Sequence, residues 1–190
     1  MTPTPGFLLM GEPLALDLVN TRVRHNGAAL DLLETPAALT MWLRRERGRV
    51  AWTGAASAAD LTAVLGLRDA IARLLCATRE HTRPPKPALD KVNRALAWPM
   101  ARPRLGWSAS EPHLVPPAPD SQRRALLHVL AADAATLLTG PQAERLRQCA
   151  HPDCILQFVA RNPRRRWCSD SVCGNRARVA RHYLHQHRTH

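Results

Sequence analysis

The sequence is poor in aromatic side chains and contains no long apolar run. Phe, Trp and Tyr together make up 4% of its 190 residues. Many RNA-binding proteins stack bases on aromatic rings, so this scarcity argues against an RNA-binding or ribosome-associated protein, which we keep as an alternative. No apolar stretch approaches the roughly 20 residues that a transmembrane helix needs, so we expect no membrane partner.

The first residues, MTPTPGFLLMGEP, also lack the features of a secretory signal. Such a signal has a positively charged start followed by an apolar core of roughly 7–15 residues. We therefore expect a cytoplasmic protein. Disulfides are rare in the reducing cytoplasm, so clustered cysteines would indicate metal or redox chemistry.

No arrangement of catalytic residues stands out either. We find no Ser/His/Asp or Cys/His arrangement and no Gly-rich phosphate-binding loop. Catalysis therefore has little support, and we do not expect an enzyme. The alternative is an enzyme whose active site lies in the N-terminal part, with the C-terminal cysteines as a structural staple.

The sequence does carry a strong positive charge, concentrated near its C-terminus. The net charge is +12, and the stretch from Cys149 to the end has eight Arg against two Asp in 42 residues. This stretch is several times more basic per residue than the first 148 residues. Such a local excess points to a polyanion, with DNA or RNA ahead of anionic lipid. A solvated basic face is the alternative.

The hydrophobic pattern predicts a mostly α-helical protein of the α+β class. One segment, 126–138, is apolar nearly all round, which is typical of a buried helix. The segment 102–120 is rich in Pro and Ser and predicts an antiparallel hairpin with strands at 104–109 and 113–115, to which residues 7–10 could add a strand. Helices are expected at residues 14–22, 35–47, 57–81, 88–98, 126–138 and 142–148.

Four cysteines form two close pairs in the C-terminal part: Cys149, Cys154, Cys168 and Cys173. Two such pairs around a short insert are typical of a tetrahedral zinc site, and four thiolates leave no open position for water. The pattern therefore predicts one structural zinc ion, with disulfides or free thiols as the alternatives. We expect residues 155–160 and 164–167 to form the two strands of the insert, and a helix to follow Cys173.

At these cysteines the sequence resembles a known family. RRRWCSDSVCGNRARVARHY, residues 164–183, resembles the CGNR zinc finger, and LALDLVNTR and LRDAI resemble the ABATE domain that precedes this finger. The resemblance implies an ABATE domain at residues 1–147 and a treble-clef-like finger at 148–190. It also implies a bacterial, DNA-binding transcription regulator, found at the nucleoid when bound, whose N-terminal domain senses a small molecule under stress.

The basic residues of the finger divide by helical position. On a helix over residues 174–188, four basic side chains share one face, and the small or apolar side chains lie opposite, toward the finger core. We expect Arg176, on the apolar side, to be structural. The three arginines before Trp167 form a second basic site, and Trp167 itself is expected to pack. The predicted nucleic-acid contacts are Arg164, Arg165, Arg166, Arg178, Arg181, His185 and Arg188.

In the N-terminal part, Arg68 lies at the centre of an apolar helical face. A buried guanidinium needs a partner, and Asp17 and Asp133 are the candidates. One reading is an internal ion pair that pins the helices. The other is a pocket for a small anionic effector, for which the candidate ligands are Asp17, Asn20, Thr21 and Arg68. A homodimer is a further expectation, because many regulators dimerise.

Overall fold

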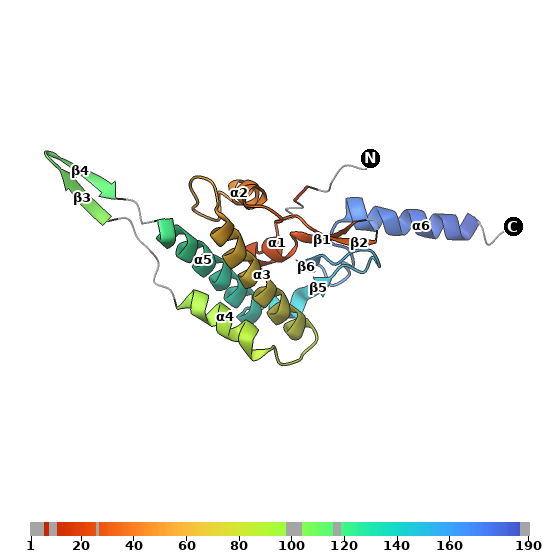
Figure 1. Ribbon diagram of the computed structural model, residues 1–190. Helices are drawn as coiled ribbons and strands as arrows, with labels where there is room; N and C mark the ends of the chain where they lie inside the picture. The colour runs from red at the N-terminus through yellow and green to blue at the C-terminus, as the bar shows by residue number, and fades with distance from the viewer. Residues whose placement is uncertain (1–5, 8–10, 26, 98–103, 116–118, 187–190) are drawn as a thin grey trace.

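The computed structural model describes residues 6–7, 11–25, 27–97, 104–115 and 119–186. The protein is mostly α-helical, and its described strands form three two-stranded antiparallel sheets. Figure 1 shows a central bundle of helices from which a hairpin extends at one end and a helix at the other. The predicted fold class is confirmed.

Five helices build the central body. Helix α3 (Ala58–Arg79) packs beside α4 (Lys86–Leu96) and α5 (Pro119–Thr139), and α1 (Leu14–Val19) contacts both α3 and α5. Helix α2 (Pro36–Arg45) contacts α3 (Figure 1). All five helices were predicted, with ends that differ by a few residues.

Local signals explain where these helices begin. The Ser57 side chain accepts a hydrogen bond from the Asp60 amide, and the Asp60 side chain accepts one from Ser57, which closes a capping box at the start of α3. Thr35 caps α2 in the same position, ahead of Pro36. Pro13 is the residue just before α1.

The core of the body is aliphatic and lies between these helices. Helix α5 is buried along most of its length, which confirms the prediction for residues 126–138. Trp42 of α2 is fully buried and closes one end of the core. The buried residues of α5 are Leu126, Leu127, Leu130, Ala131, Ala134 and Leu137.

A short hairpin joins the body to the C-terminal part. Strand β1 (Arg22–His25) pairs with β2 (Ala28–Asp31), directly after α1. Its apolar residues Val23, Leu30 and Leu32 pack against the cluster that surrounds the four cysteines. The sequence reading placed no strand in this segment.

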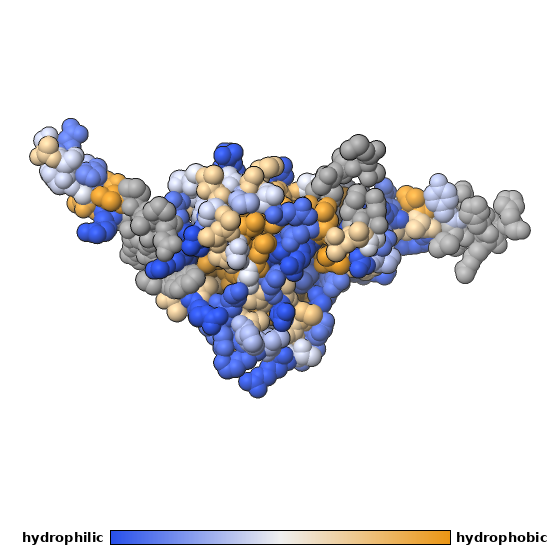
Figure 2. All heavy atoms as spheres, viewed as in Figure 1, coloured by the Kyte–Doolittle hydropathy of each residue, from blue (hydrophilic) through white to orange (hydrophobic). Residues whose placement is uncertain are grey.

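The second hairpin stands away from the body as an arm (Figures 1 and 2). It consists of β3 (Arg104–Ser108) and β4 (Glu111–Val115), as predicted, and the two strands pair only with each other among the described strands. Its register places Leu105, Trp107 and Leu114 on one face, and all three are at least two-thirds exposed. The predicted third strand, residues 7–10, lies mostly outside the described residues.

The C-terminal part begins with a short 3-10 helix, Ala143–Arg145, followed by β5 (Leu146–Gln148). Strand β5 pairs with β6 (Gln157–Val159), and Cys149 and Cys154 lie in the turn between them. A π-helical turn, Asp170–Gly174, then leads into α6 (Asn175–Gln186).

This arrangement corrects two predictions. Residues 142–148 are a helix only in their first half, because residues 146–148 find backbone partners in β6. The partner of β6 is therefore β5, and not residues 164–167. Residues 164–167 contact the turn between β5 and β6 through a backbone hydrogen bond from the Ala150 amide to the Arg166 carbonyl.

The C-terminal part is fixed to the helical body by buried polar contacts. The Asn20 amide group donates to the Gln157 carbonyl and accepts from the Gln157 amide, each at 2.8 Å, and so extends β6 as a strand would. Glu12 accepts from the Val159 amide at 2.9 Å and pairs with Arg165 at 3.1 Å. The two parts therefore share an ordered interface.

Candidate zinc centre and nucleic-acid interface

The four cysteine sulfurs of the C-terminal part meet at one point. All four are buried, and their sulfur atoms lie within 4.8 Å of one another. The Cys154 and Cys168 sulfurs are 3.8 Å apart, and those of Cys168 and Cys173 are 3.6 Å apart. No disulfide joins them. Four sulfurs at about 2.3 Å from one zinc ion would lie about 3.8 Å apart, so this cluster has the size of a tetrahedral zinc site.

The electrostatics of the cluster also fit a divalent cation. The hydrogen bond from Cys168 lowers the pKa of Cys154 to about 5. The hydrogen bond to Cys154, together with burial, raises the pKa of Cys168 far above its usual range. One thiolate thus makes ionisation of the next thiol less favourable, because the two negative charges repel each other. A bound cation offsets this repulsion. Because four sulfurs complete a tetrahedron, the ion would be structural.

Little apolar material surrounds this cluster. Its buried apolar neighbours are Leu156, Phe158 and Ala160 from the C-terminal part and Val23 from β1. Leu30, Leu32 and Trp167 pack at its edge. The β1–β2 hairpin of the helical body therefore supplies part of the core of the C-terminal part.

Arg165 is a structural residue of this region. Its guanidinium donates to the carbonyls of Trp167, Val159 and Cys168, and it lies 4.2 Å above the Phe158 ring. It also pairs with Glu12. These contacts engage all three nitrogens, which argues against the predicted role of Arg165 as a nucleic-acid contact.

Arg164 and Arg166 lie on the outside of the finger. Both are exposed, and the Arg166 guanidinium lies 5.3 Å from the centre of the Trp167 ring. Trp167 itself packs at the edge of the cysteine cluster, as expected. A side chain on Gly174 would meet the Trp167 ring at 3.2 Å, which explains why glycine suits this position.

Helix α6 projects from the cysteine cluster and makes its main contacts with the π-helical turn before it (Figure 1). Arg178 and Arg181 are exposed, as predicted, and Arg178 donates to the Asp170 carbonyl. The side chain of His185 and all of Arg188 lie outside the described residues. The role of these four residues in binding stays a prediction.

The opposite face of α6 does not pack as predicted. Tyr183, expected to face the finger core, is 58% exposed, and Val179, expected at the margin of that face, is 47% exposed. Arg176, expected to be structural, is exposed, and it is Arg178 that reaches Asp170. The reason is that α6, within the described part of the chain, packs mainly against the turn at its start, and its outer turns extend beyond that small base.

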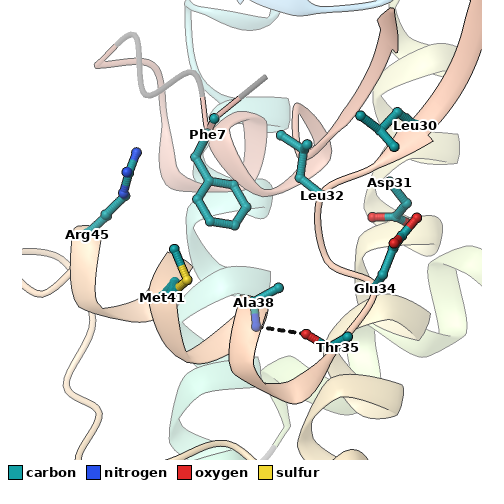
Figure 3. A pocket seen from close by; sticks show the side chains of 10 residues that line it. Phe7, Leu30, Asp31, Leu32, Glu34, Thr35, Ala38, Met41 and Arg45 are labelled. Atoms are coloured by element: carbon teal, nitrogen blue, oxygen red, sulfur yellow. Dashed lines mark hydrogen bonds between the residues drawn. The ribbon is translucent and has the colours of Figure 1, made fainter. Parts of the chain in front are cut away.

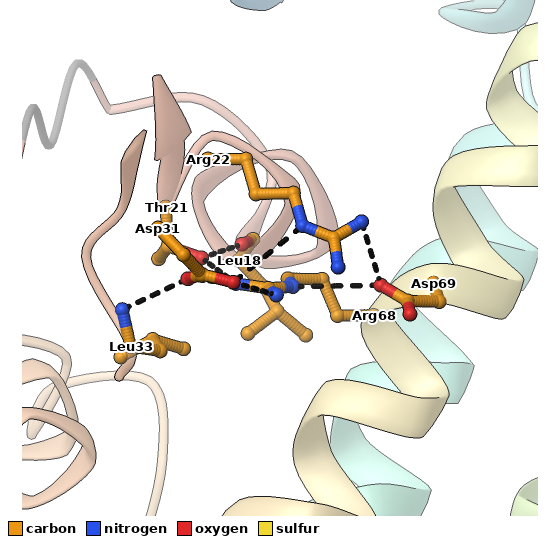
Figure 4. Close-up of polar contacts among 7 residues, drawn as sticks. All are labelled: Leu18, Thr21, Arg22, Asp31, Leu33, Arg68 and Asp69. Atoms are coloured by element: carbon orange, nitrogen blue, oxygen red, sulfur yellow. Dashed lines mark hydrogen bonds and ion pairs between the residues drawn. The ribbon is translucent and has the colours of Figure 1, made fainter. Parts of the chain in front are cut away.

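In the helical body, Arg68 is 1% exposed and forms a bidentate ion pair with Asp31 of β2 (Figure 4). Its Nη1 donates to Asp31 Oδ1 at 2.7 Å and to the Thr21 hydroxyl at 2.8 Å. Hydrogen bonds from Arg68 and from the Leu33 amide outweigh burial and hold the pKa of Asp31 below its ordinary value. The predicted internal ion pair exists, but its partner is neither Asp17 nor Asp133.

The four predicted effector ligands do not line one pocket. Asp17 pairs with Arg49, Asn20 binds the β6 backbone, and Thr21 donates to the Leu18 carbonyl while it accepts from Arg68. Asp133 accepts from the Ala15 amide and so holds the start of α1. These residues hold the structure together through contacts with other parts of the protein, although Asp17 Oδ1 is buried without a hydrogen-bond partner among the described residues.

Two family models match the sequence of this chain. One, ABATE, described as "Putative stress-induced transcription regulator", matches residues 12–141. The chain belongs to the ABATE family. The second, the CGNR zinc finger, matches residues 145–186 and contains all four cysteines. Among curated proteins, no significant match to this chain is found.

The predictions of the family and of one zinc ion as cofactor are confirmed by these matches and by the cysteine cluster. Both families are of regulator or zinc-finger type, and neither is described as an enzyme. No described helix is long and apolar enough to span a membrane. The predicted boundary between the ABATE domain and the finger at residue 147 stays a prediction.

Sequence reasoning missed three residues that organise the ABATE domain and its junction with the finger. Asp31 binds Arg68, Glu12 binds both Val159 and Arg165, and Gln157 pairs with Asn20. Asp31 stands next to three leucines, and that apolar neighbourhood was a usable signal of burial. Gln157 stands between Leu156 and Phe158 and carries the same signal, whereas Glu12 does not. Their partners could not be named from the sequence, because they lie more than 130 positions away in the chain.

Proposed function

We propose that this protein is a zinc-dependent transcription regulator that binds DNA through its finger. In this proposal Cys149, Cys154, Cys168 and Cys173 hold one structural zinc ion. The ion fixes the turn from which α6 starts, and α6 is the main DNA-binding element. The ABATE domain senses a small molecule and acts in the response to stress that the family description names.

The observation that carries this proposal is the exposure of a basic helix on a compact base. Helix α6 extends away from the body, and Arg176, Arg178 and Arg181 are all exposed on it. An α-helix fits the major groove of B-DNA, and arginine is the most common side chain that binds guanine there. A helix with several exposed arginines therefore suits DNA better than a protein core.

Arg164 and Arg166 supply a second point of contact. They lie on the segment that returns to Cys168, next to the start of α6. Arginines at this position would bind phosphates and fix the orientation of the helix without reading sequence. The expected homodimer remains a prediction, and sedimentation of the zinc-loaded chain measures it.

The proposal is tested with the zinc-loaded full chain and a fluorescent DNA duplex. We expect Arg178→Glu with Arg181→Glu to weaken binding at least tenfold and to lower the slope of log affinity against log salt by about two. The matched control, Arg73→Glu with Arg94→Glu, changes the same charge on exposed positions of α3 and α4. Equal losses in both double variants would contradict the assignment of α6.

Single-stranded RNA of the same length serves as the second ligand in this titration. Tighter binding to RNA than to the duplex would favour the RNA-binding alternative. Chromatin pull-down with sequencing then identifies the bound sites, since base contacts from α6 would select particular sequences.

A further inference from the structure

A pocket lies between the β1–β2 hairpin, the N-terminal segment and α2 (Figure 3). Its volume is about 270 Å³. Pockets for small molecules usually measure about 300–1,000 Å³, so this one suits a molecule with a single ring. None of the four predicted effector ligands lines it.

The wall of the pocket is mainly apolar. Phe7, Leu30, Leu32, Ala38 and Met41 line it, and Met41 is 52% exposed although its side chain is apolar. An exposed methionine beside an aromatic ring offers an adaptable surface for another apolar group. The body of a ligand would therefore be apolar.

The two ends of the pocket carry opposite charges. Arg45 stands at one end, and Glu34 and Asp31 stand at the other (Figure 3). Asp31 is occupied by Arg68. Within the described part of the chain, Arg45 makes no ion pair, and its guanidinium lies 5.7 Å from the centre of the Phe7 ring. A guanidinium beside an apolar wall is suited to a carboxylate.

We propose that this pocket binds a small monocarboxylate with an apolar body of about one ring. The carboxylate pairs with Arg45, and the ring lies against Phe7, Leu32 and Met41. Glu34 repels a second anionic group, which excludes dicarboxylates. This inference rests on the proposed sensing function, because it names the ligand class of the ABATE domain.

The same wall connects the pocket to the finger. Leu30 and Leu32 line the pocket and also pack against the cluster around the four cysteines. Between them, Asp31 is held by Arg68, and the Leu32 amide donates to the Thr21 carbonyl at 2.8 Å. A ligand that packs on these leucines therefore restrains a strand that forms part of the finger core. Binding at the pocket would therefore change how often the finger unfolds locally, because this strand contacts both the ligand and the finger core.

Binding is tested by calorimetry on the zinc-loaded full chain. Phenylacetate is the probe, and 2-phenylacetamide is its neutral analogue. We expect phenylacetate to bind at least tenfold more tightly than the amide. Arg45→Gln should remove this preference, whereas Arg44→Gln, an exposed neighbour that does not line the pocket, should leave it unchanged. Absence of phenylacetate binding, or equal binding to the Arg45 variant, would overturn the proposal.

The connection to the finger is tested by amide hydrogen exchange. Phenylacetate should slow exchange at least twofold in residues 28–33 and in residues 149–160. Val23→Ala, at a residue that packs in the cysteine cluster and does not line the pocket, should keep the effect at 28–33 and lose most of it at 149–160, because the side chain that joins the hairpin to this cluster is shortened. Unchanged exchange at 149–160 in the wild type would disprove the connection.

These measurements do not depend on DNA binding. If phenylacetate binds through Arg45 and slows exchange in the finger while the duplex does not bind, the pocket stands and the proposed regulator function fails. If the duplex binds through α6 and phenylacetate does not bind, the function stands and the pocket proposal fails.

Discussion

The helical body and the finger are stabilised by different means. The body has one aliphatic cluster to which α1, α2, α3, α4 and α5 all contribute, with Trp42 fully buried in it. The finger has a cluster of eight buried residues, four of which are the cysteines and one of which, Val23, belongs to the body. Apolar burial alone can hold the body, whereas the finger needs its metal ion.

The polar residues of the two regions also have different roles. In the body, buried charges are paired: Arg68 with Asp31, and Arg49 with Asp17 and Glu46. In the finger, Arg165 is partly buried and donates to the backbone carbonyls of Trp167, Val159 and Cys168. The arginines of α6 in the described part of the chain are exposed, because α6 extends beyond the small finger core.

Removal of zinc should have the largest effect, because the finger should depend on its metal ion and the helical body should not. We expect a chelator to unfold the segment 149–174 and to abolish DNA binding, while α3 and α5 stay folded, because structural zinc contributes about 10–16 kcal/mol in small zinc fingers. Hydrogen exchange should show lost protection in the finger and retained protection in residues 58–79. Cys168→Ser should reproduce the effect.

The control for that experiment is Cys76→Ser, which removes the cysteine of α3 that lies outside the cluster. This variant should keep one zinc ion per chain by native mass spectrometry. A wild-type chain that contains intact disulfides in place of zinc would refute the metal-based description of the finger.

The junction between the two regions should show an intermediate effect. Asn20→Ala removes both hydrogen bonds to Gln157 and leaves buried backbone groups without partners, which costs about 1–3 kcal/mol for each group. Urea unfolding should show this loss, and hydrogen exchange at residues 157–159 should quicken. Asn93→Ala, at an exposed position of α4, should stay within about 0.5 kcal/mol of the wild type. A similar loss in both variants would mean that the junction contributes nothing specific.

The smallest expected effect is a pH dependence that differs between two carboxylates of the body. Burial raises the pKa of Asp17 from 3.8 to about 6, although Arg49 opposes the shift. The folded chain thus binds more protons at this site than the unfolded chain between these values, so the site loses stability as pH rises from about 4 to 6. Urea unfolding of Asp17→Asn across this range should lack that decline.

Asp31 should show the opposite sign. Its pKa is lowered, so its contribution to stability is present at neutral pH and is lost as pH falls through the folded-state pKa. Asp31→Asn should therefore be less stable than the wild type at neutral pH and should approach it in acid. The same slope for both variants would contradict the two pKa directions.

The local features of this protein were determined by the sequence itself. Helix starts at Thr35 and Ser57 follow from capping residues within one turn, and the segment 126–138, which is apolar nearly all round, indicated a buried helix. The four cysteines and the residues after them identified the finger and its family. These signals depend on neighbours in the chain, so they can be read without a structure.

Only the tertiary structure decided which distant groups meet. It paired Arg68 with Asp31, placed β5 against β6 and enclosed Arg165 among backbone carbonyls. It also left the apolar face of α6 exposed, although a helical wheel predicted a packed face. A wheel shows which residues share a face but not whether another element covers it. The partner of a side chain or strand depends on which surfaces the folded helices bring into contact. The spacing of residues along the chain does not give that information.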